Sequence, residues 1–272
     1  MKYIDLSENA RDKKFVTEKF YKNGKSVEGA LWGMTLKSAG SMRFRWAENN
    51  ANRVDVLERI AGTFENKCFV PVELDHTKIV YPIQFKEDTD QKIGDGIVTF
   101  NKDLIPVVTV ADCMPVFLFE PESGFFGVVH SGWKGTGIIG EAVKMGVKEY
   151  GVHPENILIS LGPHIHDCCY VVNKERAQWF TENFTTDCVT PVKPGESLCR
   201  GAASSWNNGT GQLFRLSLLK ANLSVLERSG IRDENITIST NCTCCNEIFG
   251  SNRRETSLGT NFTVQAAFTI KL

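Results

Sequence analysis

Apolar residues in this chain gather in short runs and in longer periodic segments, a pattern that predicts strands alternating with helices. The short runs are rich in β-branched and aromatic residues, and several lack polar alternation, as expected of strands covered on both faces. The strands predicted in this way span residues 79–83, 96–100, 107–110, 116–119, 125–129, 157–160 and 236–240.

Helical periodicity is clearest over residues 137–150, where apolar positions recur every three or four residues and Gly151 supplies a stop. A second helix is expected to carry leucines on one face and to end at Gly230. Its apolar positions are Leu216, Leu219, Leu223 and Leu226, and shorter helices are predicted around 54–64 and 174–184. This mixture predicts an α/β protein with sheets flanked by helices.

Composition narrows the possible partners. The chain has 272 residues, 42% of them hydrophobic, and no internal repeat or long linker, so we expect a single domain over residues 1–272. Its 31 basic and 32 acidic residues nearly cancel, which gives no electrostatic reason to expect a nucleic acid or a membrane surface as partner. A small-molecule ligand fits better. The first nine residues lack the apolar core of a signal peptide, so we expect a cytoplasmic protein.

Nine cysteines are many for a reducing compartment, and their odd number excludes complete internal pairing. Metal ligation, nucleophilic catalysis and plain burial are the interpretations that remain open for them.

The most informative stretch is residues 109–119, where an apolar segment is interrupted by Asp112, Cys113 and a proline. A second apolar run ends in His130 and is followed by a glycine-rich turn and the first predicted helix. Such a turn exposes backbone N–H groups, and the helix start adds positive potential, so anions bind there readily. The spacing between Cys113 and His130 suits neighbouring strands that place both side chains at one end of a sheet.

This placement allows two chemistries. Thiolate and neutral imidazole bind Zn²⁺ well, and a third protein ligand leaves one coordination position open. Alternatively, His130 lowers the pKa of Cys113 and makes it a nucleophile. Burial of both side chains without chemistry is the third interpretation. Asp112 is a candidate acid–base group, or else it only orients His130 or caps the turn.

Other segments carry ligand-type residues. His76 precedes a predicted strand and can reach a strand-end site, whereas His153 lies in a polar connection. Residues 161–172 suggest a metal site when read alone, although a tight turn with packed Cys168 and Cys169 is the favoured interpretation. The three thiols within 242–245 have no downstream partner pair at zinc-ribbon spacing, which disfavours a zinc site there.

Four motifs in order resemble those of the YfiH family, also called the laccase-domain or polyphenol oxidase family. The match to this family spans roughly residues 30–270. The four motifs are Ala111-Asp112-Cys113-Met114-Pro115-Val116, His130-Ser131-Gly132-Trp133-Lys134-Gly135-Thr136, Gly162-Pro163-His164-Ile165 with Cys169-Tyr170, and Cys242-Thr243 followed by Phe249 and Arg253-Arg254.

The resemblance implies a four-layer α/β/β/α sandwich with mixed sheets, similar to the catalytic domain of a cytotoxic necrotizing factor. It also implies a zinc ion held by His76, Cys113 and His130. Phosphate would be bound by Lys134, Arg253 and Arg53. Lys134 stands where the family usually has arginine, and lysine keeps the positive charge but loses the planar fork of donors.

The activity that the resemblance implies is zinc-dependent phosphorolysis of the purine nucleosides adenosine, inosine and guanosine, with adenosine deamination and methylthioadenosine phosphorolysis as companion activities. A Cys-His hydrolase or amidase with a peptidoglycan-editing role is the second hypothesis, and a copper-dependent polyphenol oxidase is the third. A zinc-stabilised binding module would instead need a closed four-ligand site. We make no prediction of the oligomeric state.

Overall fold

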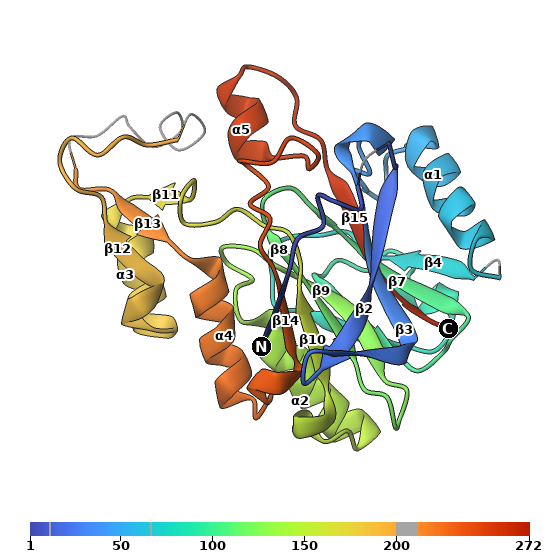
Figure 1. Ribbon diagram of the computed structural model, residues 1–272. Coiled ribbons are helices and arrows are strands. Elements are labelled where there is room, and N and C mark those ends of the chain that lie inside the picture. The colour runs from blue at the N-terminus through green and yellow to red at the C-terminus, as the bar shows by residue number, and fades with distance from the viewer. Residues whose placement is uncertain (11, 66, 200–210) are drawn as a thin grey trace.

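The computed structural model describes residues 1–10, 12–65, 67–199 and 211–272 (Figure 1). It is a mixed α/β fold built on two large sheets. The first sheet contains seven strands in the order β1 (Lys2–Ile4), β14 (Ile236–Ser239), β10 (Leu158–Leu161), β8 (Met114–Phe119), β9 (Phe126–Ser131), β6 (Gly96–Thr99) and β5 (Val80–Ile83). The pairs β1–β14, β14–β10 and β5–β6 are parallel, and the others are antiparallel.

The second sheet contains five strands, in the order β2 (Phe15–Lys22), β3 (Lys25–Thr35), β15 (Gln265–Lys271), β7 (Leu104–Val110) and β4 (Cys68–Pro71). The β2–β3 hairpin turns at Asn23 and Gly24, which both have positive φ. This is the two-residue turn chemistry that matches the twist of antiparallel strands.

The two sheets pack face to face, and their side chains alternate between two cores. In β8, Phe117 and Phe119 point into the core between the sheets, whereas Val116 and Leu118 belong to the core on the other face. Phe117 stacks on Trp32 of β3, with ring centroids 4.7 Å apart. Each aromatic side chain buried in this way stabilises the fold by about 1.5–3 kcal/mol.

Helices cover the outer faces of both sheets. On the seven-stranded sheet lie α2 (Ile138–Tyr150) and α4 (Leu218–Arg228), whose buried residues join that sheet's outer core. On the five-stranded sheet lies α1 (Ala51–Gly62), which buries Leu57 and Ile60 against it. The order of layers is therefore α/β/β/α (Figure 1).

A three-stranded sheet stands beside these layers, in the order β11 (Val171–Val172), β13 (Phe214–Leu216) and β12 (Val189–Pro191), next to α3 (Lys174–Asn183). The last helix, α5 (Asn252–Ser257), lies above β14 and β8 in the view of Figure 1. No helix among the described residues is long and apolar enough to cross a membrane.

Each strand and helix predicted from the sequence is present, with small shifts of its ends. The placement of Leu216 in the second predicted helix is wrong. Leu216 lies in β13 and pairs with Val189, and α4 begins only at Leu218. Ser217 separates the two elements because its side chain caps the helix by accepting a hydrogen bond from the Lys220 amide.

Candidate metal and substrate site

The segment 111–113 carries the chain from one sheet to the other. The apolar run 107–119 looks like one interrupted strand in the sequence, but β7 belongs to the five-stranded sheet and β8 to the seven-stranded sheet. Asp112 takes a positive φ of 80° at this crossing. Cys113 is thereby placed at the end of β8, next to the seam between the two sheets.

His130 lies near the end of β9, on the strand adjacent to Cys113. Pro115 pairs with His130 and Met114 with Ser131 in the antiparallel β8–β9 ladder. The prediction that the two side chains meet at one end of a sheet is confirmed. His76 approaches from the loop before β5, with a positive φ of 56°, and its ring lies edge-on to that of His130 at a centroid distance of 4.9 Å.

Asp95 organises this group, and it was missed as a site residue from the sequence. Its fully buried carboxylate accepts from His130 Nδ1 at 2.8 Å and from the His76 amide at 3.0 Å. It also accepts from the amide and the hydroxyl of Thr77, at 2.6 and 2.8 Å. One carboxylate therefore orients the His130 ring and fixes the backbone of the loop that carries His76.

The three side chains suit a metal ion. One ligand atom from each of His76, Cys113 and His130 lies within 4.8 Å of the other two. Because Asp95 holds Nδ1 of His130, Nε2 faces the thiol, in the carboxylate–histidine–metal arrangement typical of zinc enzymes. Gly132 leaves the necessary space, since a Cβ there would lie 2.6 Å from Cys113 Sγ and 3.3 Å from His130 Nε2.

Charges reinforce one another within this group. Burial opposes ionisation of Cys113, but His130 and His76 outweigh it and lower the pKa of the thiol to about 6. Burial likewise opposes a charged His130, but the Cys113 thiolate and Asp95 raise the pKa of the imidazole to about 10. The thiol is therefore ready to act as a thiolate at neutral pH, which both metal binding and nucleophilic attack require.

A cavity of about 490 Å³ opens over the three ligands. Its size is within the range of small-molecule sites. The wall combines aromatic side chains with cations, among them Phe44, Trp133, Tyr170, Phe262, Arg176 and Arg253. Asp112 also contributes to the lining.

Two arginines flank Tyr170 in the wall. Arg176, from α3, donates to the Tyr170 hydroxyl at 3.3 Å and lies over the Trp133 ring at 3.8 Å. Arg253, at the start of α5, donates to the Val171 carbonyl at 3.2 Å and lies 5.6 Å from the Tyr170 ring. Arg176 was also missed from the sequence, where it appeared only as a residue of the predicted helix 174–184.

The other predicted phosphate ligands lie outside the described lining of the cavity. Lys134 approaches the Trp133 ring at 5.7 Å. Arg53 lies on α1, where its guanidinium stacks over Phe44 at 4.3 Å and its Nε is buried without a described partner. Burial lowers the pKa of Arg53 to about 10. Their phosphate-binding roles stay predictions.

Asp112 connects the site to α5. Its two oxygens accept from the Thr243 hydroxyl and from the Arg253 amide, both at 2.6 Å. Burial raises the pKa of Asp112, although these hydrogen bonds oppose the shift. Since Asp95 orients His130, that alternative role falls to Asp95, and the acid–base role of Asp112 stays a prediction.

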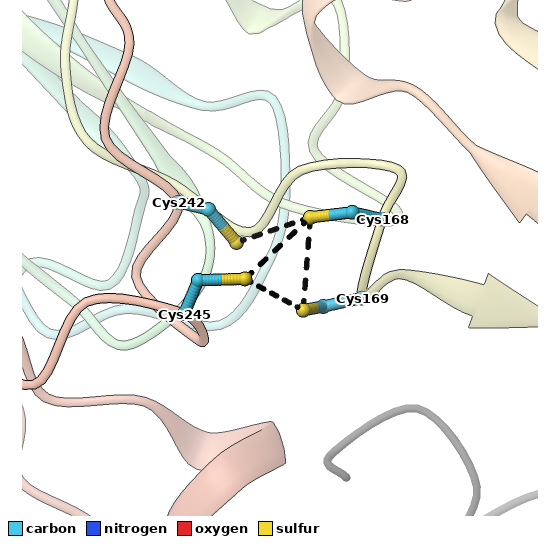
Figure 2. Close-up of side chains that lie close together, drawn as sticks. All are labelled: Cys168, Cys169, Cys242 and Cys245. Atoms are coloured by element: carbon cyan, nitrogen blue, oxygen red, sulfur yellow. Dashed lines mark hydrogen bonds between the residues drawn. The ribbon is translucent and has the colours of Figure 1, made fainter. Parts of the chain in front are cut away.

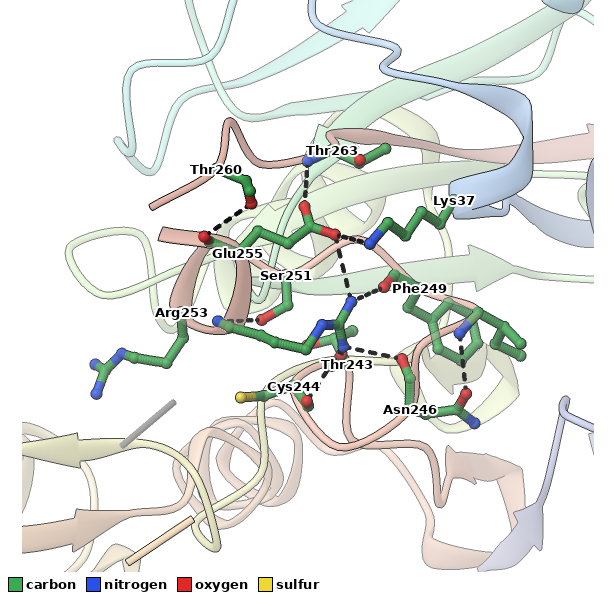
Figure 3. A network of polar contacts seen from close by, with 12 residues as sticks. Lys37, Thr243, Cys244, Asn246, Phe249, Ser251, Arg253, Glu255, Thr260 and Thr263 are labelled. Atoms are coloured by element: carbon green, nitrogen blue, oxygen red, sulfur yellow. Dashed lines mark hydrogen bonds and ion pairs between the residues drawn. The ribbon is translucent and has the colours of Figure 1, made fainter. Parts of the chain in front are cut away.

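A network of polar contacts holds α5 and the loop that precedes it (Figure 3). Arg254 donates to four backbone carbonyls of the preceding loop, at 2.5–3.2 Å: those of Thr243, Cys244, Asn246 and Phe249. The buried Glu255 forms an ion pair with Lys37 at 2.6 Å and accepts from the Thr263 amide. Of the two adjacent arginines, Arg253 therefore lines the cavity and Arg254 holds the loop.

Comparison with known proteins places this chain in a family. Residues 46–266 match the family model described as multi-copper polyphenol oxidoreductase laccase. A relative named purine nucleoside phosphorylase YlmD, from Geobacillus stearothermophilus, is 30% identical over 164 residues, which are 59% of this chain and 55% of that protein. Purine nucleoside phosphorylase LACC1 of Mus musculus is 31% identical over 215 residues, 76% of this chain and 44% of that protein. The chain thus spans about half the length of these relatives.

Solved structures show the same fold. The hypothetical protein YfiH of Bacillus licheniformis aligns with a TM-score of 0.74 at 22% identity, covering 89% of this chain and 93% of that one. The crystal structure of YlmD from Geobacillus stearothermophilus aligns with a TM-score of 0.73 at 24% identity, covering 93% and 96%. With the family match extending over most of the sequence, this chain belongs to the laccase-domain, or YfiH, family.

Proposed function

We propose that this chain is a zinc-dependent purine nucleoside phosphorylase that acts on adenosine, inosine and guanosine. The observation that carries the proposal is the three-residue ligand set of His76, Cys113 and His130 at the base of a cavity with aromatic and cationic walls. The names of relatives that are about 30% identical support the same activity.

The cavity wall suits the two substrates. Purine bases stack on aromatic rings, and Trp133, Tyr170 and Phe262 offer such surfaces. Phosphate is best held by guanidinium groups, whose donors match its oxygens in pairs, and Arg176 and Arg253 line the same wall. We therefore propose Arg176 as a further phosphate ligand, which would supply the fork of donors that Lys134 lacks.

The protein's own groups divide the remaining work. Zinc, when bound, supplies a Lewis acid that can orient an oxyanion nucleophile. Asp95 keeps His130 in the orientation and tautomer that a metal ligand needs. Asp112, which lines the cavity, is proposed as the acid that protonates the leaving base. Its two accepted hydrogen bonds hold it against the start of α5.

Lys134 and Arg53 are proposed to act less directly. The stacking of Arg53 on Phe44 stabilises an aromatic residue of the wall and adds positive potential behind it.

Adenosine deamination and methylthioadenosine phosphorolysis are proposed as companion activities of the same cavity. All nine cysteines are unpaired, in keeping with the proposed cytoplasmic location.

One observation favours a second candidate, a Cys-His hydrolase. In space, His130 lies between the Cys113 thiol and the Asp95 carboxylate, as a base lies between a nucleophile and its orienting carboxylate. A copper-dependent oxidase is favoured only by the name of the family model.

The experiment is phosphate-dependent release of free base from adenosine, inosine and guanosine by purified protein of measured metal content. We expect turnover that a chelator abolishes and zinc restores, and that is lost in His130→Ala. The exposed His153 offers a matched control, His153→Ala, which should keep full activity. Base release without phosphate, insensitive to chelator but blocked by a thiol alkylator, would favour the hydrolase. Oxidation of a phenol that depends on added copper would favour the oxidase.

A further inference from the structure

Most of the cysteines gather outside the site described above. Two of them follow β10 in the turn before β11, and others lie in the loop between β14 and α5. The residues of this cysteine cluster are Cys168, Cys169, Cys199, Cys242, Cys244 and Cys245. The sequence favours a turn with Cys168 and Cys169 packed inside and offers no partner pair at zinc-ribbon spacing for 242–245. The structure leaves Cys168 exposed and brings the two segments together.

We propose that a second metal ion, a structural zinc, is bound here by four thiolates, those of Cys168, Cys169, Cys242 and Cys245 (Figure 2). All four sulfur atoms lie within 4.8 Å of one another and point toward a common centre. This proposal does not depend on the reaction catalysed in the cavity.

The distances between sulfur atoms suit a tetrahedral ion. Cys168 Sγ lies 3.7 Å from Cys169, 3.8 Å from Cys242 and 3.7 Å from Cys245. A zinc ion with bonds of about 2.3 Å to sulfur separates its tetrahedral ligands by about 3.8 Å. Cys169 and Cys245 are somewhat closer, at 3.3 Å. None of these four distances approaches the roughly 2.05 Å of a disulfide.

The backbone under the four thiols is held independently of any ion. A parallel bridge joins His164 to Cys242, and the Thr243 amide donates to the His164 carbonyl at 3.0 Å. The His166 amide also donates to Cys242 Sγ at 3.4 Å, a contact that favours the thiolate form. Because the two loops are fixed side by side, binding an ion requires little rearrangement of the chain.

Two arginines, each also paired with a glutamate, hold the backbone on either side of such a site. Four thiolates and one Zn²⁺ carry a net charge of about −2, which needs nearby cations or hydrogen-bond donors. Arg215 donates to the Cys168 carbonyl at 2.9 Å, on one side of the cluster. Arg254 donates to the Thr243 and Cys244 carbonyls on the other side.

The remaining two cysteines make a poorer ligand set. Cys199 and Cys244 form a group of only three, and its third member is Cys169, which the four-thiol site already uses. Cys199 Sγ lies 2.7 Å from Cys169 Sγ, closer than zinc ligands stand. A disulfide between Cys169 and Cys199 is therefore the alternative to zinc binding at this cluster.

The proposed ion would tie together two parts of the cavity wall. Tyr170 directly follows Cys169, and the loop that begins with Cys242 leads into α5 and Arg253. Thr243, next to Cys242, binds Asp112. Loss of the ion should therefore loosen the wall around the substrate while it leaves His76, Cys113 and His130 in place.

The test is the zinc content of the purified 272-residue chain and three variants of it, measured by mass spectrometry of the metal. We expect two zinc ions in the wild type, one in His130→Ala, one in Cys245→Ser, and two in the control Cys68→Ser, which changes an exposed cysteine elsewhere. Cobalt substituted into His130→Ala should show the intense visible absorption of tetrahedral cobalt bound by thiolates.

The His130→Ala protein keeps every cysteine of the cluster, so it decides the matter even if Cys245→Ser fails to fold. The proposal is overturned if freshly purified His130→Ala holds no zinc and gives no thiolate–cobalt spectrum. It is equally overturned if that protein holds iron in place of zinc, or if peptide mapping under non-reducing conditions finds Cys169 joined to Cys199. Failure of phosphorolysis alone leaves all these readouts unchanged.

Discussion

Two groups of side chains that we propose as metal sites differ in almost every physical respect. The ligand set of His76, Cys113 and His130 is mixed, is anchored by the buried carboxylate of Asp95, and opens to a cavity. The cysteine cluster contains only sulfur, lies on two loops, and is anchored by backbone contacts and by arginines bound to carbonyl groups.

The two ligand sets suit different functions. Three ligands leave a coordination position for substrate, whereas four thiolates fill a tetrahedron and leave none. The carboxylate behind His130 tunes and orients a ligand, whereas the contacts behind the cysteines only hold the chain. We therefore expect variants of the first group to change turnover and variants of the second to change stability.

The largest contrast is expected between His130→Ala and Cys245→Ser. Turnover of His130→Ala should fall at least about 1,000-fold, equivalent to about 4 kcal/mol of activation free energy, because a metal ligand is lost. Cys245→Ser should keep measurable turnover but lose about 4 kcal/mol of unfolding free energy, as expected for removal of a tightly bound ligand. Steady-state kinetics and urea unfolding of both proteins check this. The comparison breaks down if the two variants lose the same property.

Asp95→Asn should have the next largest effect. Asparagine keeps the shape but removes the charge behind His130, so zinc affinity of the three-ligand site should fall about 10–100-fold. Competition with a chromophoric chelator measures this affinity. Asp103→Asn, which changes an exposed carboxylate, serves as the control. An unchanged zinc affinity would show that Asp95 only shapes the loop around His76.

Variants of the adjacent Arg253 and Arg254 should show the same contrast between turnover and stability, with smaller effects. Arg253→Ala should raise the KM for phosphate about tenfold, with little change in melting temperature, because Arg253 lines the cavity. Arg254→Ala should leave that KM nearly unchanged and cost about 1.5–3 kcal/mol of unfolding free energy, because it releases the carbonyls of the 243–249 loop. Exchange of these two outcomes would contradict the assignment.

The smallest effect is expected from Glu255→Gln, and it depends on pH. Burial opposes ionisation of Glu255, but Lys37 and the Thr263 amide outweigh it and lower the pKa of the carboxyl. Its folded-state pKa is below the unfolded value of about 4.3, so the stabilisation is present above that value and is lost as the pH falls through the folded pKa. The variant should be about 1 kcal/mol less stable at pH 7, and the difference should shrink as the pH falls through the folded pKa of Glu255. Thermal unfolding across this range measures the difference, and a constant difference would exclude Glu255 as its source.

Local pattern was enough to predict part of the site. Cys113 and His130 lie on neighbouring strands of one hairpin, so their spacing and the apolar runs around them predicted their meeting. Asp95 could not be found in this way, because its role depends on pairing between β6 and β9. A signal was nevertheless present, since Asp95 stands between two glycines directly before the predicted strand 96–100.

The cysteine cluster shows why contacts between distant segments could not be predicted from the sequence. Cys168 and Cys242 are 74 residues apart, and a bridge between two irregular loops brings them together. Neither loop has a periodicity that predicts its neighbour. The three-stranded sheet was missed for a related reason, since its strands are only two or three residues long and their burial depends on α3 and α4.

The position of β15 has a consequence for co-translational folding. Residues 265–271 follow the other four strands of this sheet in the chain, yet they form the middle strand between β3 and β7. Until they emerge, the nascent chain holds two strand pairs, β2–β3 and β4–β7, whose inner edges have unpaired backbone N–H and C=O groups. Folding of this layer must therefore wait until β15 has been synthesised, and chains stalled before β15 should be held by chaperones or degraded.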